Sequence, residues 1–304
     1  MPQPPSGLQP PASSLPRSGT VALAGRANAG KSTLLNALVG VPLAAVSDKP
    51  QTTRTRVHGV VNAPGLQATV VDTPGLHRPR SEFNRRMVAT AEKSLDEVDC
   101  VCWVVDATRP VDEELIERFA GRKVVVALNK VDLVDDKTRL LPMIAAYSRA
   151  GTVVPVSATR RDGLEPLVAA WGEHLPEGEP VYPEDQATPL PEKAIVAELV
   201  REQLVRNTGQ ELPYATAVEV ERFDESRREE GLVVIHARIV VEKPSQKAIV
   251  IGAGGRSIKR IGTQARKRIE KLLGAQVHLQ LFVAVEEGWT ENPRLLADFG
   301  YTGD

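Results

Sequence analysis

The chain has 304 residues, with 38 Lys and Arg side chains against 39 Asp and Glu, and its formal net charge is −1. This balance excludes a protein that is basic along its whole length, such as a histone-like coat for nucleic acid, but it allows a local basic face. At roughly 100–200 residues per domain, the length predicts two domains.

The first 17 residues predict a disordered tail, because six of the first 16 are proline and no hydrophobic period is present. The tail has no apolar signal core, and no stretch of the chain approaches the roughly 18–20 apolar residues of a spanning helix. Cys100 and Cys102 lie in one apolar run. That spacing predicts buried thiols in a reducing, cytoplasmic protein rather than a disulfide framework.

Short apolar runs alternate with helical patterns over residues 18–176. The expected strands are Thr20–Gly25, Val57–Val61, Ala68–Asp72, Val101–Asp106, Val124–Asn129 and Val153–Ser157. The expected helices are Lys31–Val39, Phe83–Leu95, Glu113–Phe119, Lys137–Ser148 and Leu164–Leu175. This alternation predicts an α/β domain whose largely parallel sheet carries helices on both faces.

An acidic, proline-rich stretch follows and predicts a linker over residues 177–191. Residues 192–304 have another pattern, which predicts a small α+β domain. Its expected elements are a helix at Glu192–Asn207, strands at Ala215–Phe223 and Leu232–Glu242, an apolar run at Ala248–Ile251, a basic helix at about Ser257–Leu273 and a strand at Val277–Val285.

The first strand runs into the pattern GxxxxGKS, and a helix follows it. The residues are Gly25, Arg26, Ala27, Asn28, Ala29, Gly30, Lys31 and Ser32, with Thr33 next in the helix. Glycines in such a loop let backbone N–H groups face phosphate oxygens, and the helix N-terminus adds its dipole. Lys31 is then expected on the β- and γ-phosphates and the Ser32 hydroxyl on Mg²⁺.

Three further motifs follow, each at the carboxyl end of a predicted strand, where open parallel sheets bind ligands. Asp72, Thr73, Pro74 and Gly75 form DTPG, whose acid can hold Mg²⁺ through water and whose glycine N–H can face a γ-phosphate; alone, it would be an ordinary turn. Asn129, Lys130 and Asp132 belong to NKVD, which offers a carboxylate to guanine. Ser157 and Ala158 supply a backbone N–H for the base oxygen.

The linear order of these four motifs resembles that of translation-factor-like GTPases. The stretch from Pro50 to Arg56 resembles switch I, with Thr53 favoured over Thr52 as the residue that reaches Mg²⁺. Leu76 stands where Ras-like enzymes carry a glutamine, so the chain resembles the hydrophobic-substituted class. Asn28 matches members of that class that bind K⁺; the alternative is a residue that shapes the loop.

The second domain contains a GxxG loop between two apolar elements, an arrangement typical of a KH module that seats the phosphates of a single strand. The expected RNA-binding residues are Gly252, Ala253, Gly254, Gly255, Arg256, Lys259 and Arg260. Between Ser245 and Phe282, eight basic residues (Lys247, Arg256, Lys259, Arg260, Arg266, Lys267, Arg268 and Lys271) and one acid (Glu270) give 8 − 1 = +7. This charge favours a phosphate-binding surface over a solvated helix face of mixed sign.

Together the two halves resemble the Era family of bacterial GTPases over about residues 18–304. The resemblance implies a P-loop GTPase domain with Lys31, Thr53 and Gly75 in catalysis, joined to a type II KH domain. It implies GTP or GDP and Mg²⁺ as ligands, with K⁺ as a candidate, and small-subunit (16S) ribosomal RNA near its 3′ end and the small (30S) subunit as partners. A monomer and cytoplasmic location are expected, with peripheral membrane contact in some members and no DNA partner.

One departure concerns the KH loop, where many relatives carry a basic residue between the glycines and this chain has Ala253 and Gly254. Charge must therefore come from Arg256 and Lys259. Two other functions were compatible with the sequence. The first is a nucleotide-gated RNA placeholder with negligible turnover, favoured by Leu76. The second is a tRNA-modification or double-domain GTPase, disfavoured by the KH segment and the single phosphate loop.

Overall fold

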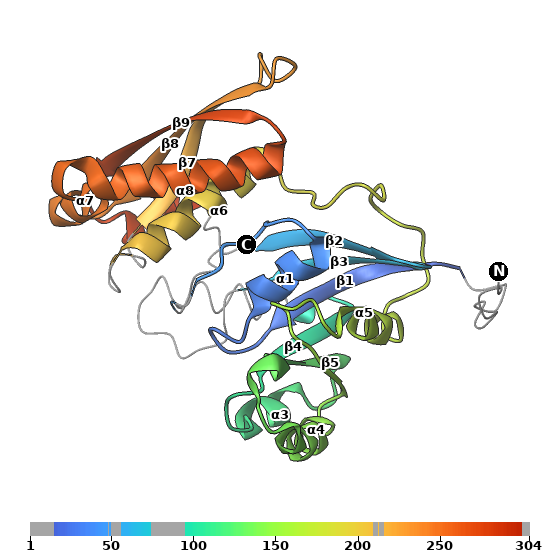
Figure 1. The fold of residues 1–304 in the computed structure, drawn as a ribbon. Helices are drawn as coiled ribbons and strands as arrows, with labels where there is room; N and C mark the ends of the chain where they lie inside the picture. Colours follow the sequence, from blue (N-terminus) through green and yellow to red (C-terminus); the bar gives the residue numbers. More distant parts are fainter. Residues whose placement is uncertain are drawn as a thin grey trace, which may run out of the picture.

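The computed structural model describes residues 15–47, 49, 56–73, 95–208, 212 and 216–299. Its larger module is built on a six-stranded sheet with the order β2-β3-β1-β4-β5-β6 (Figure 1). The strands are β1 (Arg17–Ala24), β2 (Val57–Ala63), β3 (Leu66–Asp72), β4 (Cys100–Asp106), β5 (Val124–Asn129) and β6 (Thr152–Pro155). All neighbouring pairs are parallel except β2 with β3.

Helices cover both faces of this sheet, as expected from its apolar strands. The helices are α1 (Lys31–Val39), α3 (Glu113–Phe119), α4 (Leu140–Tyr147) and α5 (Leu164–Gly172). Helices α1 and α5 share one apolar core, and α3 and α4 share the other. In the second core, Trp103 packs against Phe119 and Tyr147, with ring centroids 5.0 and 5.1 Å away.

The linker runs along the outer edge of β2 and is held there by hydrogen bonds. The Val60 N–H donates to the Ala187 carbonyl at 2.8 Å, and the Thr188 hydroxyl donates to the His58 carbonyl at 2.5 Å. The buried Gln67 side chain accepts from the backbone N–H groups of Val181 and Tyr182 at 2.7 and 2.9 Å. The proline-rich stretch is therefore an ordered strap on the first module.

The second module has three helices on one face of a mixed sheet with the order β7-β8-β9 (Figure 1). The elements are α6 (Glu192–Asn207), β7 (Thr216–Asp224), β8 (Leu232–Val241), α7 (Pro244–Ile251), α8 (Arg256–Leu273) and β9 (Gln276–Val285). β7 is antiparallel to β8, and β9 is parallel to it. The fold is thus a mostly parallel α/β module followed by a small α+β module.

Two details differ from the expected elements. The predicted tail is too long, because β1 begins at Arg17, whose N–H donates to the Gly65 carbonyl at 2.9 Å. The sequence also gave no sign of α9 (Pro293–Asp298), which packs Leu296 beside Trp289 on the other sheet face. Most of the helix expected at Phe83–Leu95 lies outside the described residues. Within those residues, no helix is long and apolar enough to cross a membrane.

Candidate functional site

The predicted nucleotide residues meet at one edge of the larger sheet. Gly25 follows β1, Asp72 ends β3, Asn129 ends β5, and Ser157 comes soon after β6. Because these strands are parallel, their carboxyl ends share an edge, and the four motifs come together there. The N-terminus of α1, with Lys31, Ser32 and Thr33 in its first turn, opens onto the same edge.

The phosphate loop, Gly25–Gly30, depends on its glycines. Gly30 caps α1 with φ 98°, and a Cβ there would lie 2.3 Å from the Asn129 amide nitrogen. Lys31 is only 6% exposed, and its ammonium donates to the carbonyls of Gly25 and Arg26 at 3.2 Å each. Burial lowers the pKa of Lys31, and the charge of Asp72 partly opposes this effect. The Lys31 ammonium is thus held against the phosphate loop, where it is expected to bind the phosphates.

Two oxygen ligands of the kind that Mg²⁺ prefers meet where the start of α1 lies beside the end of β3. The Ser32 hydroxyl donates to Asp72 Oδ2 at 2.6 Å, and Asp72 is fully buried. The adjacent Thr73 hydroxyl donates to the Leu23 carbonyl at 2.8 Å, which fixes the chain beyond β3 to β1. A hydroxyl and a carboxylate converging beside the phosphate loop fit the divalent cation implied by the motif.

The NKVD and SA segments interlock behind the phosphate loop. The Asn129 amide donates to the Ala29 carbonyl at 2.9 Å, and its oxygen accepts from the Ala158 N–H at 3.1 Å. The Ser157 hydroxyl donates to Asp132 Oδ1 at 2.6 Å. The carboxylate expected to read guanine is therefore oriented by the segment expected to bind the base oxygen.

Two side chains, Arg26 and Asp106, form ion pairs on the outer side of the phosphate loop. The sequence analysis predicted neither pair. The guanidinium of Arg26 in the phosphate loop pairs with Asp112 at 2.8 Å and Glu114 at 2.7 Å, and these hydrogen bonds raise its pKa. Asp106, which ends β4, pairs with Lys130 at 2.6 Å. An acid at the carboxyl end of a strand was the available signal, since the same argument selected Asp72.

Thr52, Thr53, Pro74, Gly75 and Leu76 lie outside the described residues, so switch I and most of the DTPG segment stay predictions. Asn28 is described and adopts the left-handed conformation, with φ 63°. Asparagine tolerates this conformation better than most residues, which supports the loop-shaping role and leaves the K⁺ role as a prediction.

The GxxG loop connects α7 to α8 in the second module. Gly252, Gly254 and Gly255 all have positive φ, at 71°, 61° and 74°. A Cβ on Gly252 would lie 2.7 Å from the Ser257 Cβ, so the first glycine permits the close turn into α8. Ala253 and Gly254 are exposed, and the Arg256 guanidinium donates to the Ala253 carbonyl at 3.2 Å. The loop therefore presents its backbone beside the N-terminus of a long helix.

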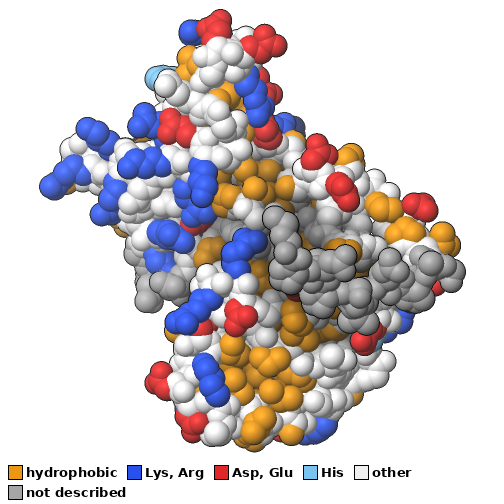
Figure 2. Space-filling model, turned by 45° about the vertical axis from the view of Figure 1, so that its right-hand side comes forward, with side chains coloured by type: hydrophobic (Ala, Val, Ile, Leu, Met, Phe, Trp, Pro, Cys, Tyr) orange, Lys and Arg blue, Asp and Glu red, His pale blue; other side chains and the backbone are white. Residues whose placement is uncertain are grey.

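Six of the seven basic residues of α8 divide into two sets, and the seventh, Lys259, is also exposed. Exposed side chains at intervals of four and seven form one face along the helix: Arg256, Arg260, Lys267 and Lys271. At about 1.5 Å per residue, this face is roughly 22 Å long. Arg268 pairs with Glu202 instead, and Arg266 lies 3.8 Å from Glu270. Figure 2 shows Lys and Arg side chains gathered on one side of the upper module.

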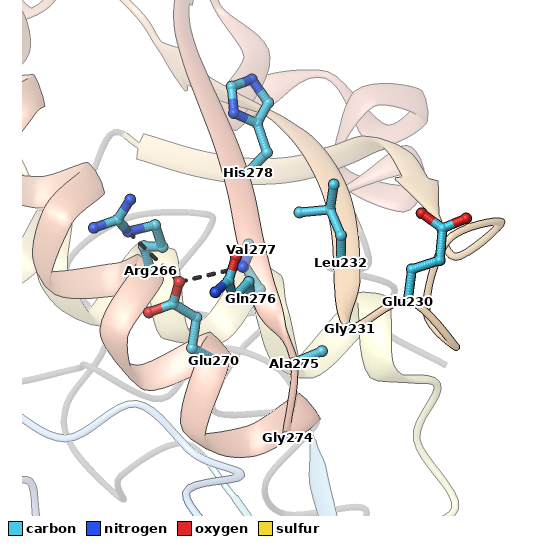
Figure 3. A pocket seen from close by; sticks show the side chains of 10 residues that line it. All are labelled: Glu230, Gly231, Leu232, Arg266, Glu270, Gly274, Ala275, Gln276, Val277 and His278. Atoms are coloured by element: carbon cyan, nitrogen blue, oxygen red, sulfur yellow. Dashed lines mark hydrogen bonds and ion pairs between the residues drawn. The ribbon is translucent and has the colours of Figure 1, made fainter.

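A hollow of about 900 Å³ lies at the other end of α8 (Figure 3). It is lined by the Glu230–Leu232 turn, Arg266, Glu270 and the Gly274–His278 segment. Glu270 accepts from the Val277 N–H at 3.2 Å and lies 3.8 Å from Arg266, and Glu230 pairs with Arg227 at 2.8 Å. The charged groups of the hollow therefore already have partners within the chain. None of the residues predicted to bind nucleotide or RNA lies in it.

The two modules touch at the segment that precedes switch I. The Arg206 guanidinium of α6 donates to the Val46 carbonyl at 2.9 Å, and Lys49 donates to the carbonyls of Val205 and Thr208. Glu202 is completely buried beneath this contact and pairs with Arg206 at 2.9 Å and with Arg268 of α8. Burial raises the pKa of Glu202 despite these arginines. A buried carboxylate thus joins the contact to the helix that follows GxxG.

Comparison with known proteins agrees with both modules. Residues 20–130 match the family model described as 50S ribosome-binding GTPase, and residues 211–290 match the KH domain model. The chain is 47% identical to GTPase Era of Trichlorobacter lovleyi and 48% identical to GTPase Era of Geotalea uraniireducens. Each alignment covers 94% of this chain and 98% of the relative.

Two solved structures match nearly the whole chain, each covering 94% of it and 99% of their own length at 37% identity. One is Aquifex aeolicus Era bound to GDP and AlF4⁻, with a TM-score of 0.87. The other is Era in complex with MgGDPNP and nucleotides 1506–1542 of 16S ribosomal RNA, with a TM-score of 0.86. From its fold, its site and these relatives, the chain belongs to the Era family of GTPases.

Proposed function

We propose that this GTPase binds small-subunit ribosomal RNA near its 3′ end through the KH module and assists assembly of the small subunit. The proposal rests on one observation: the same chain combines a phosphate-loop site with a GxxG loop and a basic helix face. The matched Era complex with MgGDPNP and nucleotides 1506–1542 of 16S ribosomal RNA supports this pairing of ligands.

In the proposed nucleotide site, Lys31 binds the β- and γ-phosphates, and the loop N–H groups from Arg26 to Thr33 surround the phosphate oxygens. Ser32 and Thr53 would ligate Mg²⁺ directly and Asp72 through water. When bound, Mg²⁺ neutralises charge on the phosphates. Asn129, Lys130, Asp132, Ser157 and Ala158 form the base pocket, which is supported by the hydrogen bonds among Asn129, Asp132 and the SA segment.

Hydrolysis needs a water molecule in line with the γ-phosphate and donors where negative charge develops. Lys31 and the loop N–H groups supply such donors, and the Gly75 N–H is expected to hold the γ-phosphate from the other side. Leu76 cannot orient the water, so no general base is assigned. K⁺ beside Asn28 is the candidate source of the remaining positive charge.

We propose that nucleotide state reaches the KH module through the contact at Val46 and Lys49. This segment directly precedes switch I, and its partners on α6 connect through Glu202 and Arg268 to α8. GTP that orders switch I would then bias the orientation of the GxxG loop. Equal RNA affinity with GDP and with a non-hydrolysable GTP analogue would refute this coupling.

The Lys49→Ala variant tests the same contact. We expect it to reduce the difference in RNA affinity between the two nucleotides while GDP binding stays unchanged. Arg149→Ala is the matched control, because the Arg149 side chain forms an exposed ion pair with Glu113, far along the chain from the contact. An unchanged nucleotide dependence in Lys49→Ala would place the coupling elsewhere.

The alternative is an RNA placeholder with negligible turnover, which the leucine at position 76 favours. Phosphate release measured in K⁺ and in Na⁺ separates the two. A marked rise in K⁺ supports the enzyme with its cation site, whereas no release in either salt, with or without RNA, supports the placeholder. The proposal also includes a monomer in the cytoplasm, a first domain that ends at residue 176 and a second over residues 192–304. Peripheral membrane contact is included on the family resemblance alone.

The base pocket and the RNA target have separate tests. Asp132→Asn should shift preference from guanine toward xanthine nucleotides, and unchanged preference would contradict the pocket.

Crosslinking the protein to RNA in cells and sequencing the bound segment tests the RNA target. Recovery of segments away from the 3′ end of the small-subunit RNA would overturn the proposed partner.

A further inference from the structure

The Asp106 carboxylate is held by its own turn and directed at the base pocket. It ends β4 directly beside Asn129 of β5, and its side chain is only 12% exposed. The Thr108 N–H and hydroxyl both donate to Oδ1, at 2.9 and 2.6 Å. This turn leaves Oδ2 to accept from the Lys130 ammonium at 2.6 Å. The orientation of the carboxylate is therefore set before any nucleotide arrives.

Lys130 is in turn fixed at both of its ends. Its ammonium also donates to the Asn28 carbonyl in the phosphate loop at 2.7 Å, and its backbone is left-handed with φ 66°. Burial would raise the pKa of Asp106, but the hydrogen bonds from Lys130 and Thr108 outweigh it and lower that pKa. At neutral pH the pair is thus a charged hydrogen bond, which is stronger than a neutral one.

We infer that Asp106 is a positioning residue for the nucleotide base: it holds the Lys130 stem along the face of the ring and ties it to the phosphate loop. The inference rests on the proposed base pocket and concerns a residue outside the four sequence motifs. Asp106 reaches Lys130 on the base side of the site rather than the Ser32 and Asp72 oxygens expected at Mg²⁺. Its contribution should therefore be the same for GDP and GTP.

The test uses the full chain with the isosteric variant Asp106→Asn. We expect the affinities for GDP and for a non-hydrolysable GTP analogue to fall by the same factor, about tenfold (about 1.4 kcal/mol). The kcat at saturating GTP should stay at the value of the unmodified chain. The Tm without nucleotide should fall only slightly, because the lowered pKa of Asp106 means that its charged form stabilises the native state. Asp136→Asn is the matched control, because Asp136 accepts from the N–H and hydroxyl of Thr138 in an exposed Asp-x-Thr turn of the same form.

The outcomes separate this inference from the function on which it rests. If Asp132→Asn does not change base preference, the pocket itself is wrong. If Asp132→Asn behaves as expected and Asp106→Asn binds GDP as tightly as the unmodified chain, the role of Asp106 is refuted. A loss of Tm and kcat together with affinity would also refute it, by making Asp106 a structural support. Thr108→Val removes the hydroxyl donor to the Asp106 carboxylate but keeps the N–H donor at the same position. It should therefore give a smaller loss of affinity, and it provides a second reading if Asp106→Asn folds poorly.

Discussion

Helix α1 has a left-handed glycine at each end, and this pair allows the cost of a side chain in the phosphate loop to be measured. Gly30 precedes the helix with φ 98°, and Gly40 follows it with φ 88°. Alanine at either position must adopt a conformation that costs an L-residue about 1–2 kcal/mol. We expect Gly30→Ala and Gly40→Ala to share this loss in the free energy of unfolding.

Only Gly30→Ala also creates a collision. Its Cβ would lie 2.3 Å from the Asn129 amide nitrogen, whereas nothing lies within 4 Å of a Cβ on Gly40. Asn129 is 2% exposed and cannot move without breaking its bonds to the Ala29 carbonyl and the Ala158 N–H. At about 1 kcal/mol net for each bond, the loss is about 2 kcal/mol. If binding must restore that geometry, GDP affinity falls about 30-fold.

Urea denaturation measures the loss in the free energy of unfolding that the two variants share. Calorimetric titration with GDP measures the loss of GDP affinity, which is expected in Gly30→Ala alone. Gly40→Ala should bind GDP as the unmodified chain does. If Gly30→Ala binds GDP within about threefold of Gly40→Ala, the contact between Asn129 and the phosphate loop does not support binding, and the reasoning fails.

Two further outcomes follow from the described contacts. Burial and the charge of Arg56 hold the pKa of His58 below its ordinary value of 6.5, so the unfolded chain binds a proton that the native chain does not. The stability that His58 contributes is present above pH 6.5 and is lost as the pH falls through the lowered pKa. The drop in Tm between about pH 7.5 and pH 5.5 should therefore be smaller in His58→Gln than in the unmodified chain. An equal drop would contradict this assignment. Arg260→Ala on the basic face of α8 should weaken RNA binding and reduce the slope of log affinity against log salt by about 1, and an unchanged slope would exclude a phosphate contact.

The nucleotide site was largely accessible from the sequence, because its chemistry is carried by short motifs at strand ends. Their meeting at one edge follows from a parallel sheet alone, so Gly25, Asp72 and Asn129 could be brought together before the fold was known. The role of Asp106 could not, although it too ends a strand. Its meaning depends on β4 lying beside β5, and that order comes from the packed sheet.

Contacts between distant segments could not be predicted from the sequence either, because they too depend on how the elements pack. Glu202 sits among charged residues in α6 and resembles an ordinary solvated acid, yet it is buried by segments from both modules. Helix α9 has only six residues, which is too short for a hydrophobic period to be recognised. In the sequence, proline content indicates that residues 177–191 are extended, but it says nothing of the strand on which they lie.

The strap along β2 changes how far the RNA-binding module can travel. A free chain of 15 residues could extend about 50 Å, but hydrogen bonds fix this one as far as Thr188, and α6 begins at Glu192. Three residues, spanning about 10 Å at most, are left between them. The connection is thus a short segment anchored at the sheet edge rather than a long flexible linker. Such a short connection keeps the KH module at a high effective concentration beside the nucleotide switch.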